Sequence, residues 1–363
     1  MREKKVVVVD DSAFMRKLVT EFLSSHPELE VVATARNGKD AIEKIKQFKP
    51  AVITMDVEMP EMDGLDALGY IMEHMPTPIV MLSSLTGAGA ETTFQAMEKG
   101  AVDFVRKPSG TISLDLHKIK DELIEKVLAA SKANLRPMIP TAQAAPPKPA
   151  RVEQPPGKRE VRVSSRNTRK PKNSQSIVVI GTSTGGPRAL QKVLTKLPKD
   201  LKAPVLIVQH MPPGFTKSLA QRLDSLSAIH VKEAEDGETL QKGTAYICPG
   251  SYHLKIKENG ALLAIDLDQS PPVNGHRPAV DVMFESVSEA TGFDKVAVIM
   301  TGMGADGANG LIKLKETGNV QAIAESEESC VVFGMPRAAI ATRLIDCTVS
   351  VEHIAEKILE YIG

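Results

Sequence analysis

The chain has 363 residues, a length that favours two domains, and 42% of them are hydrophobic, enough for both to be globular. Its 45 basic and 45 acidic residues cancel, which leaves no strong field to draw it onto nucleic acid or an anionic membrane. Three cysteines without C-x-x-C spacing fit a reducing compartment and give no zinc site. Without a signal-peptide core or an apolar run of the ~20 residues that span a membrane, we expect a cytoplasmic protein that does not insert into one.

Residues 1–130 alternate short apolar strands with helical patterns. The five predicted strands are Val6–Val9, Val31–Ala35, Ala51–Met55, Ile79–Leu82 and Val102–Val105. Successive βα units are typical of a parallel sheet covered by helices on both faces. The first helix is predicted to begin after Ser12 as N-cap, with Phe14, Leu18 and Phe22 along one apolar face.

Acidic residues stand at the carboxyl ends of two of these strands, where parallel sheets collect ligands. Asp10 and Asp11 follow the first strand, and Asp56 follows the third. Clustered carboxylates repel one another, so a bound Mg²⁺ is a natural means of holding them together. Ser83 and Lys107, at two other strand ends, supply a hydroxyl and a cation suited to phosphoryl oxygens.

This pocket resembles that of the receiver domain of response regulators, and the resemblance covers residues 3–125 or so. It implies that Asp56 is the phosphoacceptor, that a histidine kinase donates the phosphate, and that Mg²⁺ is needed for phosphorylation. The Mg²⁺ ligands that it implies are Asp10, Asp11, Asp56 and the backbone carbonyl of Glu58. It also implies that Ser83, Phe104 and Lys107 are switch residues, and that Lys107-Pro108 is of the type that is cis in receivers.

Composition changes after the receiver-like segment. Residues 131–175 are rich in Pro, Ala and basic residues with few large apolar ones, which predicts a flexible linker. In residues 176–363 strand and helix patterns alternate again. The predicted strands are Ile177–Ile180, Val205–Gln209, Val296–Met300 and Val320–Ala324, with a hairpin around Tyr246–Ile265. We therefore expect two doubly wound α/β domains: a flavodoxin-like receiver, and a Rossmann-like parallel-sheet domain with an antiparallel hairpin.

The hexapeptide Gly-Thr-Ser-Thr-Gly-Gly at 181–186 directly follows an apolar strand. Such a turn into a helix can expose a nucleophile, here Ser183, although glycine-rich turns more often cradle a phosphate. The lysine of a P-loop and the spacing of a dinucleotide loop are both missing. From the pattern alone, both readings stay open.

A serine nucleophile needs an imidazole base and a carboxylate that orients it. His210 ends a strand that we expect beside that of Ser183, although a structural histidine is an equally good reading. Asp306 lies within the glycine-rich segment 301–307, at the start of the next predicted helix, where it could orient His210 or serve only as a helix N-cap. The chain order Ser, His, Asp differs from that of the α/β-hydrolases, which run Ser, acid, His.

The motifs at 181–186, 209–212 and 300–307 together resemble the catalytic domain of the CheB family of chemotaxis methylesterases. That resemblance implies a phosphorylation-activated enzyme that removes methyl esters from glutamates of methyl-accepting chemoreceptors, releasing methanol, with some members also deamidating glutamines. By position it implies Ser183 as nucleophile, His210 as base and Asp306 as its orienter. The backbone N–H of Met303 is the implied oxyanion donor, and Thr184 neighbours the nucleophile.

Acyl transfer through a serine needs no metal, and we expect the receiver to cover the catalytic cleft until Asp56 is phosphorylated. Two rivals belong to other classes of protein. A transcriptional response regulator would need a helix-turn-helix and a basic face, which the neutral charge opposes. A catalytically inactive scaffold would lack one of Ser183, His210 and Asp306, and all three are present.

Overall fold

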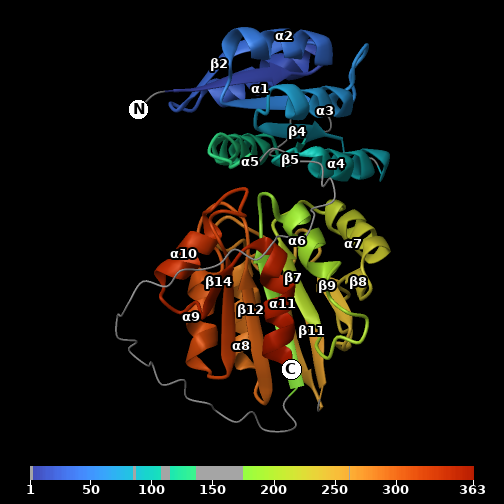
Figure 1. The fold of residues 1–363 in the computed structure, drawn as a ribbon, viewed down its shortest axis with the longest axis vertical. Coiled ribbons are helices and arrows are strands. Elements are labelled where there is room, and N and C mark those ends of the chain that lie inside the picture. The colour runs from blue at the N-terminus through green and yellow to red at the C-terminus, as the bar shows by residue number, and fades with distance from the viewer. Residues whose placement is uncertain (1–2, 85–86, 108–114, 136–174, 261) are drawn as a thin grey trace, which may run out of the picture.

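The computed structural model describes residues 3–84, 87–107, 115–135, 175–260 and 262–363. These residues form two α/β halves, each with its own parallel sheet (Figure 1). This arrangement confirms the fold class predicted from the alternating strand and helix patterns. None of the helices in the described ranges combines the length and the apolar character that a membrane span needs.

The first half holds a sheet of five parallel strands in the order β2-β1-β3-β4-β5. Its elements are β1 (Lys4–Val9), α1 (Ala13–Ser24), β2 (Leu29–Ala35), α2 (Gly38–Phe48), β3 (Val52–Asp56), α3 (Gly64–His74), β4 (Ile79–Ser83), α4 (Gly87–Lys99), β5 (Asp103–Arg106) and α5 (Asp115–Ala130). Helices cover both faces, so the strand residues Val6, Val7, Val8 and Val9 are all fully buried. This burial accounts for the unbroken apolar runs that marked the strands in the sequence.

The first helix, α1, begins as expected, and its most deeply buried side chains lie next to the predicted face. The Ser12 hydroxyl accepts a hydrogen bond from the Met15 N–H and caps the helix. The predicted face is covered only in part, because Phe14 is 70% exposed whereas Phe22 is partly buried and packs against the core. Val19 and Leu23 are more deeply buried, one position further round the helix. Because Phe14, Leu18 and Phe22 have the same four-residue spacing as this pair, periodicity alone did not fix the phase.

The second half holds seven parallel strands in the order β14-β13-β12-β6-β7-β9-β8, and a separate hairpin of β10 and β11. Its strands are β6 (Gln175–Thr182), β7 (Val205–Gln209), β8 (His230–Glu233), β9 (Thr244–Ile247), β10 (His253–Asn259), β11 (Leu262–Asp268), β12 (Phe293–Ile299), β13 (Val320–Glu325) and β14 (Cys347–Val349). Its helices are α6 (Gly186–Leu194), α7 (Phe215–Leu226), α8 (Val280–Glu289), α9 (Ala308–Glu316), α10 (Met335–Ala341) and α11 (Val351–Ile362).

The predicted hairpin is correct only in its second part. β10 and β11 pair antiparallel, with Asn259 opposite Leu262 across the turn. Tyr246 lies instead in β9, which joins the main sheet parallel to β7. Its ring is fully buried, and its hydroxyl accepts a hydrogen bond from the Gln241 N–H. The apolar run at 244–247 is therefore a core strand, and the hairpin begins only at His253.

The two halves meet along the α4–β5–α5 side of the first, which faces the part of the second that carries α6 and α7 (Figure 1). At one edge, the Arg222 guanidinium of α7 forms hydrogen bonds of 2.6–3.0 Å with the Glu98 carboxylate of α4. Elsewhere the Asn134 N–H donates to the Val331 carbonyl at 3.0 Å. The face of the second half that receives these contacts is the one that holds Ser183.

Candidate active site

The acidic pocket lies at the carboxyl ends of β1 and β3. Asp10 and Asp11 follow β1 directly, and Asp56 ends β3, the neighbouring parallel strand. Carboxylate oxygens of the three residues lie within 4.8 Å of one another. Asp10 and Asp56 are buried, and Asp11 is exposed. The sheet thus brings Asp56 into one pocket with Asp10 and Asp11, from which it is distant in the sequence.

Lys107 extends from the end of β5 into this pocket. Its ammonium lies 2.9 Å from Asp10 Oδ2 and 2.5 Å from Asp56 Oδ2. Burial raises the pKa of Asp56 to about 6, and the hydrogen bond from Lys107 offsets only part of that rise. Burial alone would lower the pKa of Lys107, but Asp56 and Asp10 raise it above its usual value. Buried carboxylates that draw in a cation also fit a hard divalent ion, which Asp10, Asp11 and Asp56 would hold through oxygen.

Two further residues named from the sequence border this pocket. Ser83 ends β4 with a buried side chain, and its hydroxyl accepts a hydrogen bond from Thr93 at 2.7 Å. The Glu58 N–H donates to Asp56 Oδ1 at 3.4 Å, which places the Glu58 backbone beside the pocket. Pro108, and with it the Lys107-Pro108 peptide, lies outside the described residues.

Two contacts of β5 connect this half directly to the other. The buried ring of Phe104 packs on Phe215, at the start of α7, with a centroid distance of 4.5 Å and an interplanar angle of 39°. The buried Thr184 hydroxyl donates to Asp103 Oδ2 at 2.5 Å. Phe104 and Asp103 are consecutive residues of β5. The Asp103 hydrogen bond therefore links β5 directly to Thr184, the residue that follows Ser183.

The turn that carries Ser183 is built from glycines for steric reasons. β6 ends at Thr182, Gly185 has a φ of +79°, and α6 begins at Gly186. A side chain at Gly185 would be strained by that φ, and one at Gly302 would meet the Ser183 Cβ at 2.8 Å. The Ser183 N–H donates to the Thr301 carbonyl at 3.0 Å, which fixes the turn against the end of β12.

Ser183, His210 and Asp306 form one hydrogen-bonded chain at this edge of the sheet. The His210 Nδ1 lies 3.2 Å from Ser183 Oγ, and its Nε2 lies 2.7 Å from Asp306 Oδ2. Asp306 also accepts from the N–H groups of Val280 at 2.7 Å and Asp281 at 2.9 Å. A carboxylate at Nε2 keeps the proton of the neutral ring on that nitrogen, which leaves Nδ1 free to accept the serine proton.

Asp306 is buried yet remains an acceptor. Burial pushes its pKa up, but the hydrogen bond and charge of His210 and the two backbone N–H donors outweigh burial, so the pKa lies below its usual value. Met303 lines the same cavity as Ser183 and His210. Among the described residues, its backbone N–H donates to no protein acceptor. An unpaired donor beside a serine can stabilise a developing oxyanion.

Comparison with known proteins places both halves in families. Residues 178–358 match the family described as CheB methylesterase, and residues 6–117 match the response regulator receiver domain. A protein-glutamate methylesterase/protein-glutamine glutaminase of Geobacillus kaustophilus is 58% identical over 363 residues, covering 100% of both chains. The protein of that name from Bacillus subtilis is 51% identical, over 98% of this chain and 97% of its own.

The chain belongs to the CheB methylesterase family. The solved catalytic domain of Thermotoga maritima CheB methylesterase matches with a TM-score of 0.50 and 48% identity, covering 52% of this chain and 99% of that chain. The second half is thus a methylesterase domain, which rules out the DNA-binding output domain considered above. The first half is a response regulator receiver domain.

The CheB methylesterase domain also contains a residue whose place at the site was not predicted. The ring of His276 stacks on that of His210, with centroids 4.0 Å apart and planes 13° apart. Burial, followed by the charge of His210, lowers the pKa of His276 to about 4, so this ring is neutral near pH 7. The sequence showed only a His-Arg-Pro loop, and no spacing in it points to stacking on a residue 66 positions earlier.

Replacing His276 by phenylalanine is expected to make stability less sensitive to acid. Between about pH 6.5 and about pH 4 the unfolded chain binds a proton at His276 that the folded chain does not. Stability therefore falls as the pH drops through this window, by ~3 kcal/mol at most. Thermal melting from pH 4 to 7 should show a flatter dependence for His276→Phe, whose ring can still stack. The half-exposed His74 provides the matched control, His74→Phe, and equal slopes for His276→Phe and wild type would contradict the expectation.

The triad faces a cavity of about 610 Å³ that both domains line. The catalytic domain contributes Ser183, His210 and the segment from 275 to 278, and the receiver contributes α5. A pocket of this size suits a small ligand or a single side chain with its neighbours. In the closed arrangement seen here, anything that reaches Ser183 through this cavity must share it with α5.

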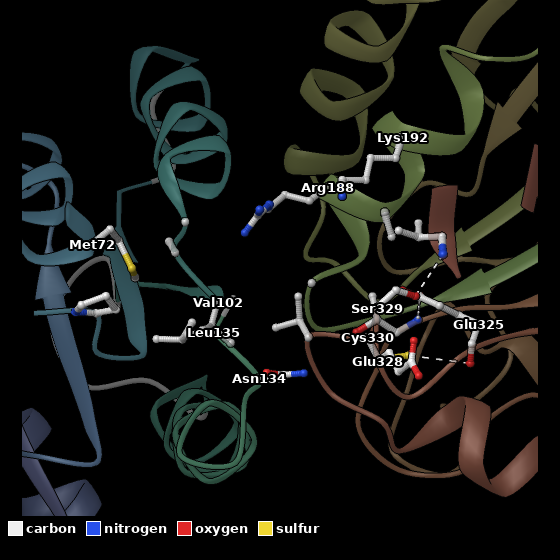
Figure 2. Close-up of a pocket in the computed structure, with 18 residues that line it drawn as sticks. Met72, Val102, Asn134, Leu135, Arg188, Lys192, Glu325, Glu328, Ser329 and Cys330 are labelled. Carbon is white, nitrogen blue, oxygen red and sulfur yellow. Dashed lines mark hydrogen bonds between the residues drawn. The ribbon is translucent and has the colours of Figure 1, made fainter. Parts of the chain in front are cut away.

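A second, smaller cavity of about 110 Å³ lies elsewhere between the domains (Figure 2). Met72 and Leu135 of the receiver face Arg188 and Lys192 of α6 across it (Figure 2). Gly185 and Thr301 also line it, so it adjoins the turn that carries Ser183. Burial lowers the pKa of Arg188. The turn that carries Ser183 thus lines two cavities, and residues of both domains form the walls of each.

Proposed function

We propose that this protein hydrolyses the methyl esters of glutamate side chains on chemoreceptors in the cytoplasm, under the control of its receiver. The observation that carries the proposal is the hydrogen-bonded chain from Ser183 through His210 to Asp306 in a cavity between the domains. The names of its relatives support glutamate as the substrate. Glutamine would react by the same acyl transfer, with ammonia as the leaving group.

The proposed reaction has two halves. Ser183 Oγ attacks the ester carbonyl as its proton passes to His210 Nδ1, and the Met303 N–H stabilises the oxyanion. Collapse breaks the bond to the methoxy group, and His210 returns the proton so that methanol leaves. Water then attacks the glutamyl-serine ester with His210 as base again, which releases glutamate and restores Ser183. Asp306 holds the ring and stabilises the imidazolium formed in each half.

We further propose that phosphorylation of Asp56 by a histidine kinase releases this site. Mg²⁺, when bound, neutralises charge on the incoming phosphoryl group. A phosphoryl group on Asp56 replaces the single negative charge of its carboxylate by about two negative charges beside Lys107, which is now paired with Asp10 and Asp56. Lys107 and Ser83 are thereby drawn to the phosphoryl oxygens. Movement of the adjoining β5 would weaken the Phe104–Phe215 and Asp103–Thr184 contacts and uncover Ser183.

Methanol release from methylated receptor membranes tests this proposal. We expect hydrolysis by the intact chain, and a faster rate with a small-molecule phosphodonor and Mg²⁺ than without them. The Asp56→Asn variant should keep the slow rate in both conditions, because it lacks the acceptor carboxylate. Absence of methanol would overturn the esterase assignment. An equal response of wild type and Asp56→Asn to the phosphodonor would overturn the role of Asp56.

Reversing the charges of the Glu98–Arg222 pair tests the closed arrangement separately. Arg222→Glu places two carboxylates against each other across the interface. Glu98→Arg places two guanidinium groups against each other at the same point. Each single variant should raise the unphosphorylated rate of methanol release about fivefold, since a partly exposed pair contributes ~1 kcal/mol. The double variant restores opposite charges and should return the rate to the wild-type value. A double variant as fast as either single one would contradict closure through this contact.

A further inference from the structure

The receiver helix α5 presents a row of acidic side chains to the catalytic cavity. Its residues that line the cavity are Asp121, Glu122, Glu125, Lys126 and Ala129. They recur every three to four positions, so they form one face of the helix. Three of the five carry carboxylates, and Ala129, with its small side chain, lies one turn beyond Glu125. An acidic helical face thus lies opposite the serine of an esterase whose relatives are named for acting on glutamate.

The opposite wall of the cavity is suited to an acidic helix. Arg277 lines it, and its Nη1 is fixed by the carbonyls of Gln269 at 2.7 Å and Ser270 at 3.0 Å. Its Nε is buried and, within the described ranges, has no hydrogen-bond acceptor. A guanidinium N–H buried without an acceptor is unfavourable, and in the closed state this holds for the Nε of Arg277 but not for its Nη1. Met211 and Met303 provide flexible apolar contacts on the same wall.

Within the cavity α5 itself is an imperfect occupant. Glu122 is turned partly to its own helix, with an oxygen 2.9 Å from the Lys126 ammonium. Burial is the largest influence on Glu125 and raises its pKa, and the nearby charges of Lys126 and His210 offset only part of that rise. Lys126 is itself held by Asp103 and by the Phe104 carbonyl. Within the described ranges, neither Glu122 nor Glu125 forms a hydrogen bond or an ion pair with the catalytic domain, which suits an occupant that must leave.

We propose that α5 is a built-in stand-in for the substrate, and that the groove it occupies is the docking groove for an acidic α-helix of the receptor. This inference rests on the proposed esterase function and names how its substrate is held. The partner helix would carry glutamyl groups three or four residues apart and a small residue one turn beyond them, as α5 does. A free carboxylate such as that of Glu125 has no methanol to release, so α5 can occupy the groove without being consumed.

A peptide of residues 115–130 tests the shared groove directly. It is stapled between positions 123 and 127, whose side chains pack in the receiver core and do not line the cavity. Circular dichroism should verify that the stapled peptide is helical before use. We expect the peptide to inhibit methanol release by the phosphorylated intact chain competitively with receptor membranes. The Glu125→Lys peptide should inhibit about tenfold more weakly, because it brings a cation into a cavity that Arg277 also lines. The Lys120→Gln peptide, changed outside the cavity face, should match the parent peptide.

Variants of the enzyme provide the second arm. In the phosphorylated chain, Arg277→Gln should raise the KM for receptor and the inhibition constant of the peptide by the same factor. Arg222→Gln is the matched control, because Arg222 binds receiver α4 and does not line this cavity, so neither constant should change. Melting temperatures should establish that both variants are folded. Equal inhibition by the parent and Glu125→Lys peptides would still contradict the inference if Arg277→Gln proved unstable.

The outcomes separate this inference from the function on which it rests. If the phosphorylated chain releases no methanol from receptors, the esterase proposal fails. If it releases methanol but the helical peptide does not compete, α5 merely blocks the entrance and the inference is wrong. If Arg277→Gln raises only one of the two constants, receptor and α5 use different surfaces, and the inference is again wrong.

Discussion

Replacing Ser183 by alanine is expected to lower methanol release from methylated receptors by about 10⁶-fold in the phosphorylated chain. The change removes the only atom that we propose to form the acyl-enzyme bond. His210 and Asp306 would remain paired at 2.7 Å, but the imidazole would have no serine proton to accept. Only transition-state binding by the oxyanion donor would remain, which is worth far less than the complete triad. Initial rates of methanol release provide the measurement.

The fold and the phosphorylation of the receiver should be unchanged by this substitution. The Ser183 N–H bonds to the Thr301 carbonyl through the backbone, so the turn keeps its anchor without the hydroxyl. Thermal stability should therefore change little, and Asp56 in the other domain should still accept a phosphoryl group. A Ser183→Ala protein that kept a thousandth or more of the wild-type rate would show that another group is the nucleophile. Loss of phosphorylation as well would point instead to a folding defect.

The strands and the three hydrogen-bonded residues could be anticipated because their signals are local. A buried strand is a largely apolar run, and charged or polar residues mark its end, as Asp56 does for β3 and Gln209 with His210 for β7. Parallel pairing then brings strand ends to one edge whatever their distance in the sequence. That is why Ser183, His210 and Asp306 were expected to be neighbours, and the structure has them within hydrogen-bond distance. Residues 181–186 alone did not distinguish a phosphate loop from a nucleophile turn. The distinction depended on His210 and Asp306, which lie far along the chain.

What remained hidden depends on surfaces that come together only in the folded chain. The Asp103–Thr184 hydrogen bond joins residues 81 positions apart in different domains, and nothing near either one marks it. The same holds for the ring contact of Phe104 with Phe215. The stacking of His276 on His210 needs the 272–278 loop to fold back over the cavity. The exposure of Phe14 was missed because α1 carries two apolar rows with the same four-residue spacing. The fully buried row is that of Val19 and Leu23, and Phe14 belongs to the other.

Replacing Asp306 by asparagine is expected to lower the rate by about 10⁴-fold with little change in the backbone. Both carboxylate oxygens of Asp306 accept hydrogen bonds, one from His210 and Val280 and the other from Asp281. An amide offers one acceptor oxygen and one NH₂ donor, so it cannot satisfy all three donors. If its NH₂ faces His210, the ring proton moves to Nδ1, and His210 then donates to Ser183 instead of accepting its proton.

Asp281, whose backbone N–H donates to Asp306, provides a control of the same residue type. It is also buried, and its Oδ1 accepts from the N–H groups of Gly307 at 2.9 Å and Gly310 at 2.7 Å, but it makes no hydrogen bond to His210. Asp281→Asn should therefore cost stability, as losing a buried acceptor does, while kcat falls far less than in Asp306→Asn. Both variants should be compared at a temperature where each is folded. If the two lost activity equally, Asp306 would act only by holding α8 and α9 together, whereas a loss confined to Asp306→Asn places its role at the imidazole.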